Sequence, residues 1–391
     1  MTRSFLAACL LVALSSNMAS SEPLVEQFDV FVSGTEGYHT FRIPVLVVST
    51  KGTVMAFCEG RKETREDFGN IHLMLKRSFD GGKTWGDLQM IYNEAETGEK
   101  VACGNPCPVV DQDTGRIHLV FCRDNDGQFV THSDDDGQTW SKPRDITSTC
   151  DKDDWGFYGT GPGHGLQLRE GPNAGRLLIP SYHFQLKGRK GPHSHMIYSD
   201  DHGETWQLGG IVPLSKDAKP DPAGNYYAGG ECSVIELGPD IVYLNTRCGR
   251  YASKCDRRTY TYSYDGGMTW EPIRADNELI APGCHGAVLA DPKRDTVLFA
   301  NPGNGPDPNW DKGRKRMTVR ASFDKCKSWP AWQVLHTGAS SYADLALLED
   351  GIILCLYEGG RGHRREWMRL ARFTLAWLAD GQEPISGAPG Q

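Results

Sequence analysis

Three arginine-containing segments could bind a small anion. They are Phe41-Arg42-Ile43-Pro44, the run Leu244-Asn-Thr-Arg247, and the basic stretch from Gly313 to Arg320 that includes Arg314 and Arg316. A guanidinium group is a planar fork that binds both oxygens of a carboxylate and stays charged. The chain as a whole has a formal net charge of −8, which argues against nucleic acid as a partner. A small arginine-lined pocket on an acidic protein suits a compact anionic ligand, because local charge controls a buried site.

A repeated structural unit must position these side chains. It is marked by a pattern of the form Ser-x-Asp-x-Gly-x-Thr-Trp, which recurs along the chain. Its copies stand about sixty residues apart, a spacing typical of one repeated supersecondary unit. In a tight turn the Asp accepts hydrogen bonds from backbone N–H groups, the Gly takes a positive φ, and the Trp packs between adjacent sheets. The pattern therefore predicts hairpin turns without chemistry of their own. The copies begin at Ser78, Ser133, Ser199, Ser263 and, with Cys326 in place of the Gly, at Ser322.

Length and composition favour one large β domain. The chain has 391 residues, of which 45 are glycine and 22 are proline. Without a leader, it has room for six units of about sixty residues, and each unit matches a four-stranded blade with its loops. No helical period of useful length occurs. Short β-rich runs predict strands at residues 45–48, 54–57, 117–121, 241–244 and 352–357.

The repeat is identified as the Asp-box, and Phe41-Arg42-Ile43-Pro44 matches the F/Y-R-I-P motif. Together they resemble the exo-α-sialidase (neuraminidase) family, and family-like stretches at 104–111 and 155–168 extend the resemblance along the chain. The resemblance implies an all-β, six-bladed β-propeller formed by residues 22–391 as a single domain, with the boxes away from the active site. The box alone also occurs in propellers that only bind.

The resemblance implies that three arginines grip the substrate carboxylate. Arg42 belongs to the F/Y-R-I-P motif, Arg247 matches an L-N-x-R segment, and Arg314 matches R-x-x-L/M-T-V. Arg316 is a weaker alternative for the third arginine, because strand alternation would turn it in another direction. Glu358 matches the acid that orients Arg42 through a charge-assisted ion pair.

The resemblance also places the general acid and base after the first arginine. Asp67 matches the aspartate of the family's R-x-x-x-x-(x)-D-x-G-D-I loop, and Arg61 resembles an additional arginine bordering the pocket. Glu66 is the alternative acid, although the glycine at position 69 favours Asp67. Asn70 departs from the aspartate often found there, so contacts on the glycerol or leaving-group side are open.

Tyr342 is the predicted nucleophile. The anomeric carbon of sialic acid carries a carboxylate, so an anionic Asp or Glu would be repelled where a neutral tyrosine is not; a tyrosine nucleophile is a recognised feature of sialidases. Tyr342 stands in a segment like the family's Y-S-x-L. A phenol is mostly protonated at neutral pH and needs a base. Glu231, in a segment similar to N/G-E-C-x-V, is expected to be that base.

These matches imply a retaining exo-α-sialidase that releases terminal sialic acids from glycans, glycoproteins or glycolipids through a covalent tyrosyl intermediate. It is expected to be a monomer that needs no metal and no organic cofactor. Transfer of the sialic acid to another sugar, release by its own hydroxyl, and preference for deaminated sialic acid (KDN) are alternatives that the motifs do not separate. A non-catalytic sugar-binding propeller is disfavoured by the joint presence of the acid, the nucleophile and the arginines.

Residues 1–21 are predicted to be a secretory signal peptide. Arg3 is followed by an apolar run at 5–14 and by the small residues Ala19-Ser-Ser21. The apolar run is too short to span a bilayer, and no later segment comes close. A secreted, lumenal or periplasmic protein without an integral membrane segment is therefore expected.

The cysteines predict both free thiols and disulfides. Of 12 cysteines one, Cys9, lies in the leader, which leaves an odd number and at least one unpaired thiol. Three of them, in apolar strand runs, are expected to act as small buried hydrophobes: Cys58, Cys122 and Cys355. Two pairs are close enough in sequence to form disulfides if their loops allow it: Cys103 with Cys107, and Cys248 with Cys255.

Overall fold

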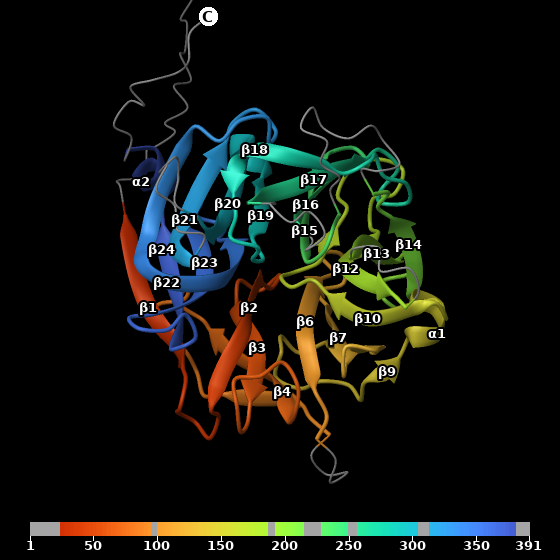
Figure 1. Ribbon diagram of the computed structural model, residues 1–391, viewed down its shortest axis with the longest axis horizontal. Helices are drawn as coiled ribbons and strands as arrows, with labels where there is room; N and C mark the ends of the chain where they lie inside the picture. The colour runs from red at the N-terminus through yellow and green to blue at the C-terminus, as the bar shows by residue number, and fades with distance from the viewer. Residues whose placement is uncertain are drawn as a thin grey trace, which may run out of the picture.

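The computed structural model describes residues 24–94, 100–186, 192–214, 228–248, 256–303 and 313–380. The described residues are mainly β-strands, with short helices α1 (Thr147–Cys150) and α2 (Leu375–Asp380) and a 3-10 turn at Pro292–Arg294. Figure 1 shows the sheets arranged around a central region, so the fold is all-β and propeller-like. Within the described ranges, no helix is long and apolar enough to cross a membrane.

Four sheets follow the chain order, and their strands are antiparallel. The predicted strands at 45–48, 54–57, 117–121 and 241–244 are confirmed as parts of β2, β3, β7 and β16. The first sheet consists of β2 (Thr40–Val48), β3 (Val54–Arg61), β4 (Ile71–Ser78) and β5 (Gln89–Tyr92). The second consists of β6 (Cys103–Val110), β7 (Ile117–Arg123), β8 (Gly127–Ser133) and β9 (Arg144–Asp145). The third consists of β10 (Trp155–Thr160), β12 (Leu177–Gln185), β13 (His193–Ser199) and β14 (Gln207–Ile211), with β11 (Leu166–Gln167) beside β12. The fourth consists of β15 (Cys232–Gly238), β16 (Ile241–Arg247), β17 (Arg257–Ser263) and β18 (Arg274–Ile280).

The last sheet has seven strands in the order β1-β24-β23-β22-β21-β20-β19. The long strand β22 (Ala331–Leu347) pairs through residues 331–339 with β21 and through residues 339–347 with β23. The strand β1 (Val25–Val32) pairs with β24, so the first and the last strand of the described chain lie in one sheet. The remaining strands are β19 (Ala287–Asp291), β20 (Thr296–Pro302), β21 (Lys315–Ser322), β23 (Ile353–Gly360), which contains most of the predicted strand at 352–357, and β24 (Trp367–Phe373).

The hydrophobic core lies between neighbouring sheets. Phe57 and Leu75 of the first sheet belong to one buried cluster with Leu119 and Phe121 of the second. Trp140, from the second repeat, packs edge-on against Phe57 with ring centroids 5.9 Å apart. The predicted packing of the repeat tryptophans between adjacent sheets is therefore observed at this copy.

Each repeat closes the turn that follows the third strand of its unit, because its Ser is the last residue of β4, β8, β13, β17 or β21. In the first copy, Asp80 Oδ1 accepts hydrogen bonds from the backbone N–H of Lys83 (3.0 Å) and Thr84 (2.9 Å). Asp80 Oδ2 accepts the Thr84 hydroxyl at 2.6 Å, and these hydrogen bonds lower the pKa of Asp80 to about 2. The side chain of Ser78 in turn accepts the Gly82 N–H at 2.8 Å.

The altered fifth copy keeps the same turn at a conformational cost. Cys326 has φ of 67°, close to the positive φ of the glycines it replaces. A non-glycine residue is rarely found there, because its Cβ crowds the backbone. Ser322 and Asp324 nevertheless make the same hydrogen bonds as in the other copies. The turn is therefore set mainly by the Ser and the Asp.

Replacing Asp80 with alanine is expected to lower the melting temperature by several degrees while leaving kcat per folded molecule nearly unchanged. The change removes the acceptor for two backbone N–H groups and for the hydroxyls of Ser78 and Thr84, and each such hydrogen bond contributes on the order of 1 kcal/mol. Thermal unfolding followed by circular dichroism checks the first part, and active-site-normalised kinetics the second. Asp87→Ala, at an exposed aspartate just beyond the same repeat, is the matched control. Loss of turnover in fully folded Asp80→Ala protein would place this turn at the active site.

The predictions for the buried cysteines are confirmed, whereas one of the two disulfide predictions is wrong. Cys58, Cys122 and Cys355 are free and buried, as expected. The Cys103–Cys107 pairing is wrong, because both thiols are free and buried in β6. Their pairing partners on β7, Arg123 and Val120, are three residues apart, which is about 10 Å along a strand and beyond the reach of a disulfide. Cys248 is disulfide-bonded, whereas its expected partner Cys255 lies outside the described residues.

Candidate active site

The predicted site residues come from three of the five sheets and meet in one place. Three of the four acidic and phenolic side chains are largely buried: Glu231, Tyr342 and Glu358. Asp67 is the exception, with its side chain 62% exposed. Arg42 lies in β2, Arg61 ends β3, Asp67 is in the β3–β4 connection, Glu231 directly precedes β15, Arg247 ends β16, Arg314 directly precedes β21, Tyr342 is in β22 and Glu358 in β23.

Tyr342 and Glu231 form a hydrogen-bonded pair. The Tyr342 hydroxyl donates to Glu231 Oε1, and Arg247 Nη1 lies 3.0 Å from Glu231 Oε2. Burial raises the pKa of Glu231, but Arg247 and the Tyr342 hydrogen bond outweigh it and bring the pKa to about 2. Burial and the Glu231 charge raise the pKa of Tyr342. The pair is therefore a carboxylate facing a neutral phenol, which is the starting state for a base and its nucleophile.

Two arginines contact the Tyr342 ring, and a third contacts its hydroxyl. The guanidinium carbon of Arg42 lies 5.0 Å from the ring centroid and that of Arg314 lies 5.5 Å from it. Arg247 Nη1 reaches the Tyr342 hydroxyl at 3.4 Å. The structure thus brings the three predicted arginines to one side chain, and their charges lower the pKa of Tyr342 against the effect of burial.

Glu358 holds Arg42 as predicted. Its Oε1 lies 3.0 Å from Arg42 Nε and also accepts the backbone N–H of Ile43 at 3.0 Å. Glu358 is fully buried, and although burial raises its pKa, Arg42 and the Ile43 N–H lower it below the ordinary value. A buried carboxylate that is paired this way fixes the plane of the guanidinium.

Asp67 rests between two arginines. Its Oδ1 lies 2.6 Å from Arg61 Nη1 and 3.2 Å from Arg42 Nη1. Burial raises the pKa of Asp67, but Arg61 first and Arg42 next outweigh it, so the pKa lies below its ordinary value. Glu66, the alternative acid, has an exposed side chain 3.9 Å from Arg65. Of the two carboxylates, Asp67 is the one in contact with Arg42 and Arg61.

Among the described residues, uncharged polar atoms hold Arg314 in place. It donates from Nη1 to Ser341 Oγ (3.2 Å) and from Nη2 to the Gly283 carbonyl (2.9 Å). The further arginine of the same segment, Arg320, is buried and donates to Asn301 within the sheet. These positions favour Arg314 as the third arginine of the site.

Sequence reasoning missed Glu59, which holds Arg61. Glu59 Oε2 lies 2.6 Å from Arg61 Nη2, and Glu59 Oε1 accepts the Asn105 N–H at 2.9 Å. The signal was present, because residues two apart in a strand lie on the same face. His285, whose ring lies 5.7 Å from that of Tyr342, was missed as well, and no spacing in the sequence pointed to it.

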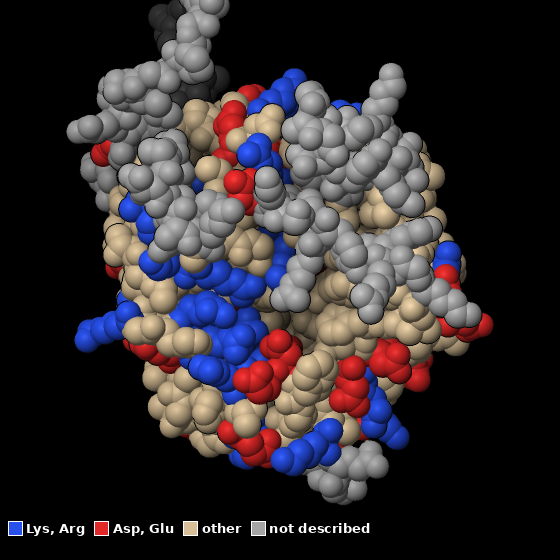
Figure 2. All heavy atoms as spheres, in the orientation of Figure 1, with Lys and Arg blue, Asp and Glu red and all other residues tan. Residues whose placement is uncertain are grey.

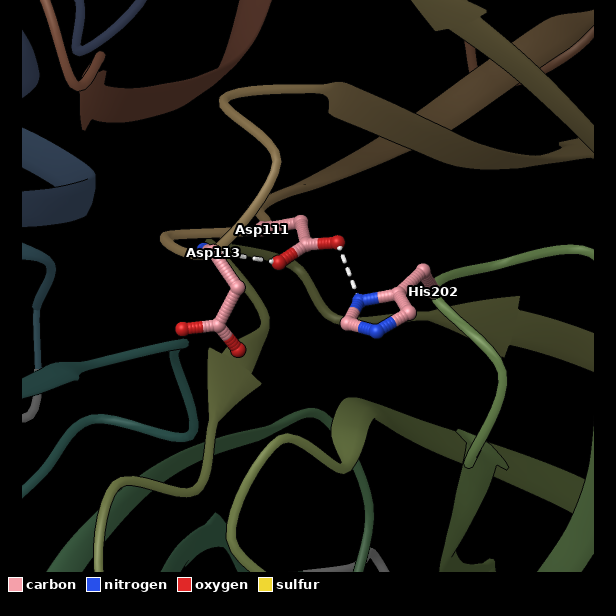
Figure 3. A group of neighbouring side chains, drawn as sticks. All are labelled: Asp111, Asp113 and His202. Atoms are coloured by element: carbon pink, nitrogen blue, oxygen red, sulfur yellow. Dashed lines mark hydrogen bonds and ion pairs between the residues drawn. The ribbon is translucent and has the colours of Figure 1, made fainter.

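One group of side chains has the residue types of a metal site, but its buried carboxylate already accepts hydrogen bonds from neighbouring side chains. Asp111, Asp113 and His202 lie together, and His202 Nδ1 is 2.8 Å from Asp111 Oδ2 (Figure 3). The buried Asp111 also accepts hydrogen bonds from Thr114 Oγ1 (2.8 Å) and Gln167 Nε2 (2.9 Å). With its oxygens occupied by these donors, Asp111 ties a turn of the second sheet to the third repeat, which contains His202.

Comparisons with known proteins agree on the family. Residues 52–355 match the model of the BNR repeat-like domain. The chain is 31% identical to a sialidase of Micromonospora viridifaciens over 91% of its own length and 55% of that protein, and 28% identical to human sialidase-3 over 90% and 93%. Among solved structures, the Hadza microbial sialidase Hz136 superposes with a TM-score of 0.76 at 25% identity over 90% of this chain and 69% of that chain. The chain therefore belongs to the sialidase (neuraminidase) family, and it spans about half the length of the Micromonospora relative.

Proposed function

We propose that the chain is a retaining exo-α-sialidase that hydrolyses terminal sialic acids through a covalent tyrosyl intermediate. The observation that supports this most directly is the hydrogen bond from Tyr342 to the ionised Glu231, with Arg42, Arg247 and Arg314 around the same ring. A neutral nucleophile at the centre of three cations suits a substrate whose reacting carbon carries a carboxylate.

In the first step, the Tyr342 oxygen attacks the anomeric carbon while its proton passes to Glu231. The glycosidic bond breaks, and the leaving oxygen takes a proton from Asp67. In the second step, water attacks the same carbon and gives a proton to Asp67. The tyrosyl bond then breaks, and the Tyr342 oxygen recovers its proton from Glu231, which restores the starting state.

Binding of the substrate would prepare Asp67 for its role as acid. In the free enzyme Asp67 shares Arg42 with Glu358, and the arginines hold its pKa below the ordinary value. The substrate carboxylate would compete with Asp67 for Arg42 and would add a negative charge nearby. Both effects raise the pKa of Asp67, because each disfavours its ionised form.

The fold proposal is a six-bladed propeller formed by residues 22–391 as one domain. The two separate pairings of β22, with β21 and with β23, support division of the seven-stranded sheet into two blades. In this division residues 331–339 are the outer strand of one blade and residues 339–347 the inner strand of the next. We further propose that residues 1–21 direct a monomeric enzyme to a secreted, lumenal or periplasmic location.

The proposal is tested by following the products of 3′-sialyllactose and 4-methylumbelliferyl sialosides by NMR. Retaining hydrolysis is expected to release the α-anomer of free sialic acid first, followed by mutarotation. Initial release of the β-anomer would contradict a tyrosyl intermediate. An anhydro sugar or a new sialoside would instead identify intramolecular release or transfer. The panel includes N-acetyl, N-glycolyl and deaminated (KDN) sialosides, so the relative rates also assign the preferred sialic acid.

Replacing Arg247 with lysine is expected to weaken substrate binding by more than an order of magnitude. Arg247 contacts both Glu231 and the Tyr342 hydroxyl, and a single ammonium group cannot replace the two-pronged grip of a guanidinium on a carboxylate. Steady-state kinetics and titration with a sialic acid analogue measure the effect. Arg169→Lys, at an exposed arginine paired with Asp113, is the control. Unchanged KM and kcat in Arg247→Lys would make Arg247 a structural residue.

A further inference from the structure

Two arginines outside the predicted site, Arg364 and Arg365, add to its positive charge. They lie in the connection between β23, which carries Glu358, and β24. Figure 2 shows Lys and Arg side chains gathered in one continuous area near the centre of the face viewed. The charges that act on Arg364 include those of Arg314, Arg42 and Glu358. Arg365 is affected by the charges of Arg42, Glu358, Arg61 and Asp67.

The backbone of this connection is fixed. The Glu366 carboxylate accepts the backbone N–H groups of Arg361 (2.8 Å), Gly362 (3.0 Å) and His363 (2.7 Å). The Arg365 carbonyl accepts the Ser33 hydroxyl at 2.9 Å. The two arginines are therefore presented by an ordered turn anchored to the segment between β1 and β2.

Arg365 is held against the loop that carries the general acid. Its Nη1 donates to the Arg65 carbonyl at 2.7 Å, and the same carbonyl accepts Arg61 Nη1, also at 2.7 Å. Arg61 Nη1 in turn contacts Asp67. Because Asp67 would protonate the leaving oxygen, the sugar attached to that oxygen must lie on the side of the site where Arg365 stands.

Within the described ranges, neither of these two arginines forms an ion pair with a carboxylate of its own. The Nε atoms of Arg364 and Arg365 are buried, and neither has a hydrogen-bond partner among the described residues. The neighbouring carboxylates are already engaged, Glu358 by Arg42, Asp67 by Arg61 and Arg42, and Glu366 by three backbone N–H groups. Burial and the Arg42 charge lower the pKa of Arg365 to about 10. A second anion, in addition to the carboxylate of the sialic acid being released, would relieve this repulsion.

We propose that Arg364 and Arg365 form an anion-binding subsite for the leaving group, so that the enzyme prefers sialosides whose leaving sugar carries its own carboxylate or sulfate. This inference rests on the proposed sialidase function. A carboxylate is present when the leaving sugar is itself a sialic acid, and a sulfate when it is a sulfated hexose. Both are oxyanions that a pair of guanidinium groups recognises in the same way.

The test compares kcat/KM for three substrates: neutral-leaving-group 3′-sialyllactose, an α2,8-linked disialyl glycan, and a sialoside with a 6-sulfated leaving sugar. We expect wild-type enzyme to favour at least one charged substrate over the neutral one. The double variant Arg364→Gln/Arg365→Gln is expected to reduce that ratio about tenfold, the effect of losing a charge-assisted hydrogen bond. Arg361→Gln, at an exposed arginine of the same turn, is expected to keep the wild-type ratio.

The two charged substrates identify the source of the anion, since a preference confined to one of them assigns the carboxylate or the sulfate. In wild-type enzyme the preference should also weaken as NaCl is raised from roughly 20 mM to 500 mM, because salt screens a partly exposed charge pair. This second measurement does not depend on how the variants fold. A wild-type ratio near one for both charged substrates, or an unchanged ratio in a folded double variant, overturns the subsite. Failure of wild-type enzyme on aryl sialosides as well would instead overturn the sialidase function.

Discussion

Tyr342→Phe is expected to lose nearly all turnover, by about a thousandfold or more, while still binding a sialic acid analogue. The change removes only the hydroxyl that donates to Glu231. The aromatic ring that Arg42 and Arg314 contact remains, so both arginines should keep their places. Loss of the nucleophile without loss of binding lowers kcat far more than it changes affinity.

Burst kinetics with an aryl sialoside and calorimetric titration with the analogue measure the two quantities separately. Tyr264→Phe, at a tyrosine that is 60% exposed, removes the same atom away from the site and should leave both unchanged. Near wild-type turnover in Tyr342→Phe would remove Tyr342 from the mechanism. Loss of analogue binding together with turnover would show instead that the hydroxyl orders Glu231 and Arg247.

Asp67→Ala is expected to be crippled on sialyllactose and much less affected on activated aryl sialosides. The alcohol leaving group of a natural glycoside must be protonated as the bond breaks, whereas a phenolate leaves readily without a proton. Formation of the tyrosyl intermediate can therefore survive with an aryl substrate. Attack by water needs the same residue as a base, so azide, which needs no base, is expected to rescue part of the rate.

The ratio of the two losses, measured by kcat/KM on each substrate with and without azide, decides the role of Asp67. Glu66→Ala is the matched control, because Glu66 is the adjacent exposed carboxylate, next to Arg65. Equal losses on both substrates without rescue would mean that Asp67 only shapes the pocket through Arg42 and Arg61. In that outcome the sialyllactose activity of Glu66→Ala becomes the next measurement, since Glu66 would be the remaining candidate acid.

The turns were predictable from the sequence because their interactions are local. Ser78, Asp80 and Thr84 contact one another within seven residues, so the pattern contains the whole hydrogen-bond network of the turn. The strand runs were predictable for a similar reason, since alternation and β-branched residues act over a few positions. The repeat spacing predicted one repeated supersecondary unit, and the resemblance carried by the repeats and by Phe41-Arg42-Ile43-Pro44 implied the propeller class.

The residues of the candidate site could also be predicted from sequence motifs, but the contacts between these residues could not. The motifs identified Arg42 and Glu358, which are more than three hundred residues apart, and only the pairing of the sheets around one centre brings their side chains to 3.0 Å. The resting contact of Asp67 with Arg42 likewise depends on how the β3–β4 connection folds over the end of β2.

The sequence by itself thus determined the repeating unit, the turns and the types of residue available for chemistry, because these depend on neighbours along the chain. The tertiary structure alone decided which distant elements meet. It separated Cys103 from Cys107 along β6, which pairs with β7, paired β1 with β24, and set Arg365 against the loop of Asp67. Each of these is a long-range contact, and no local pattern encodes a contact whose partner is fixed by the closure of the whole sheet arrangement.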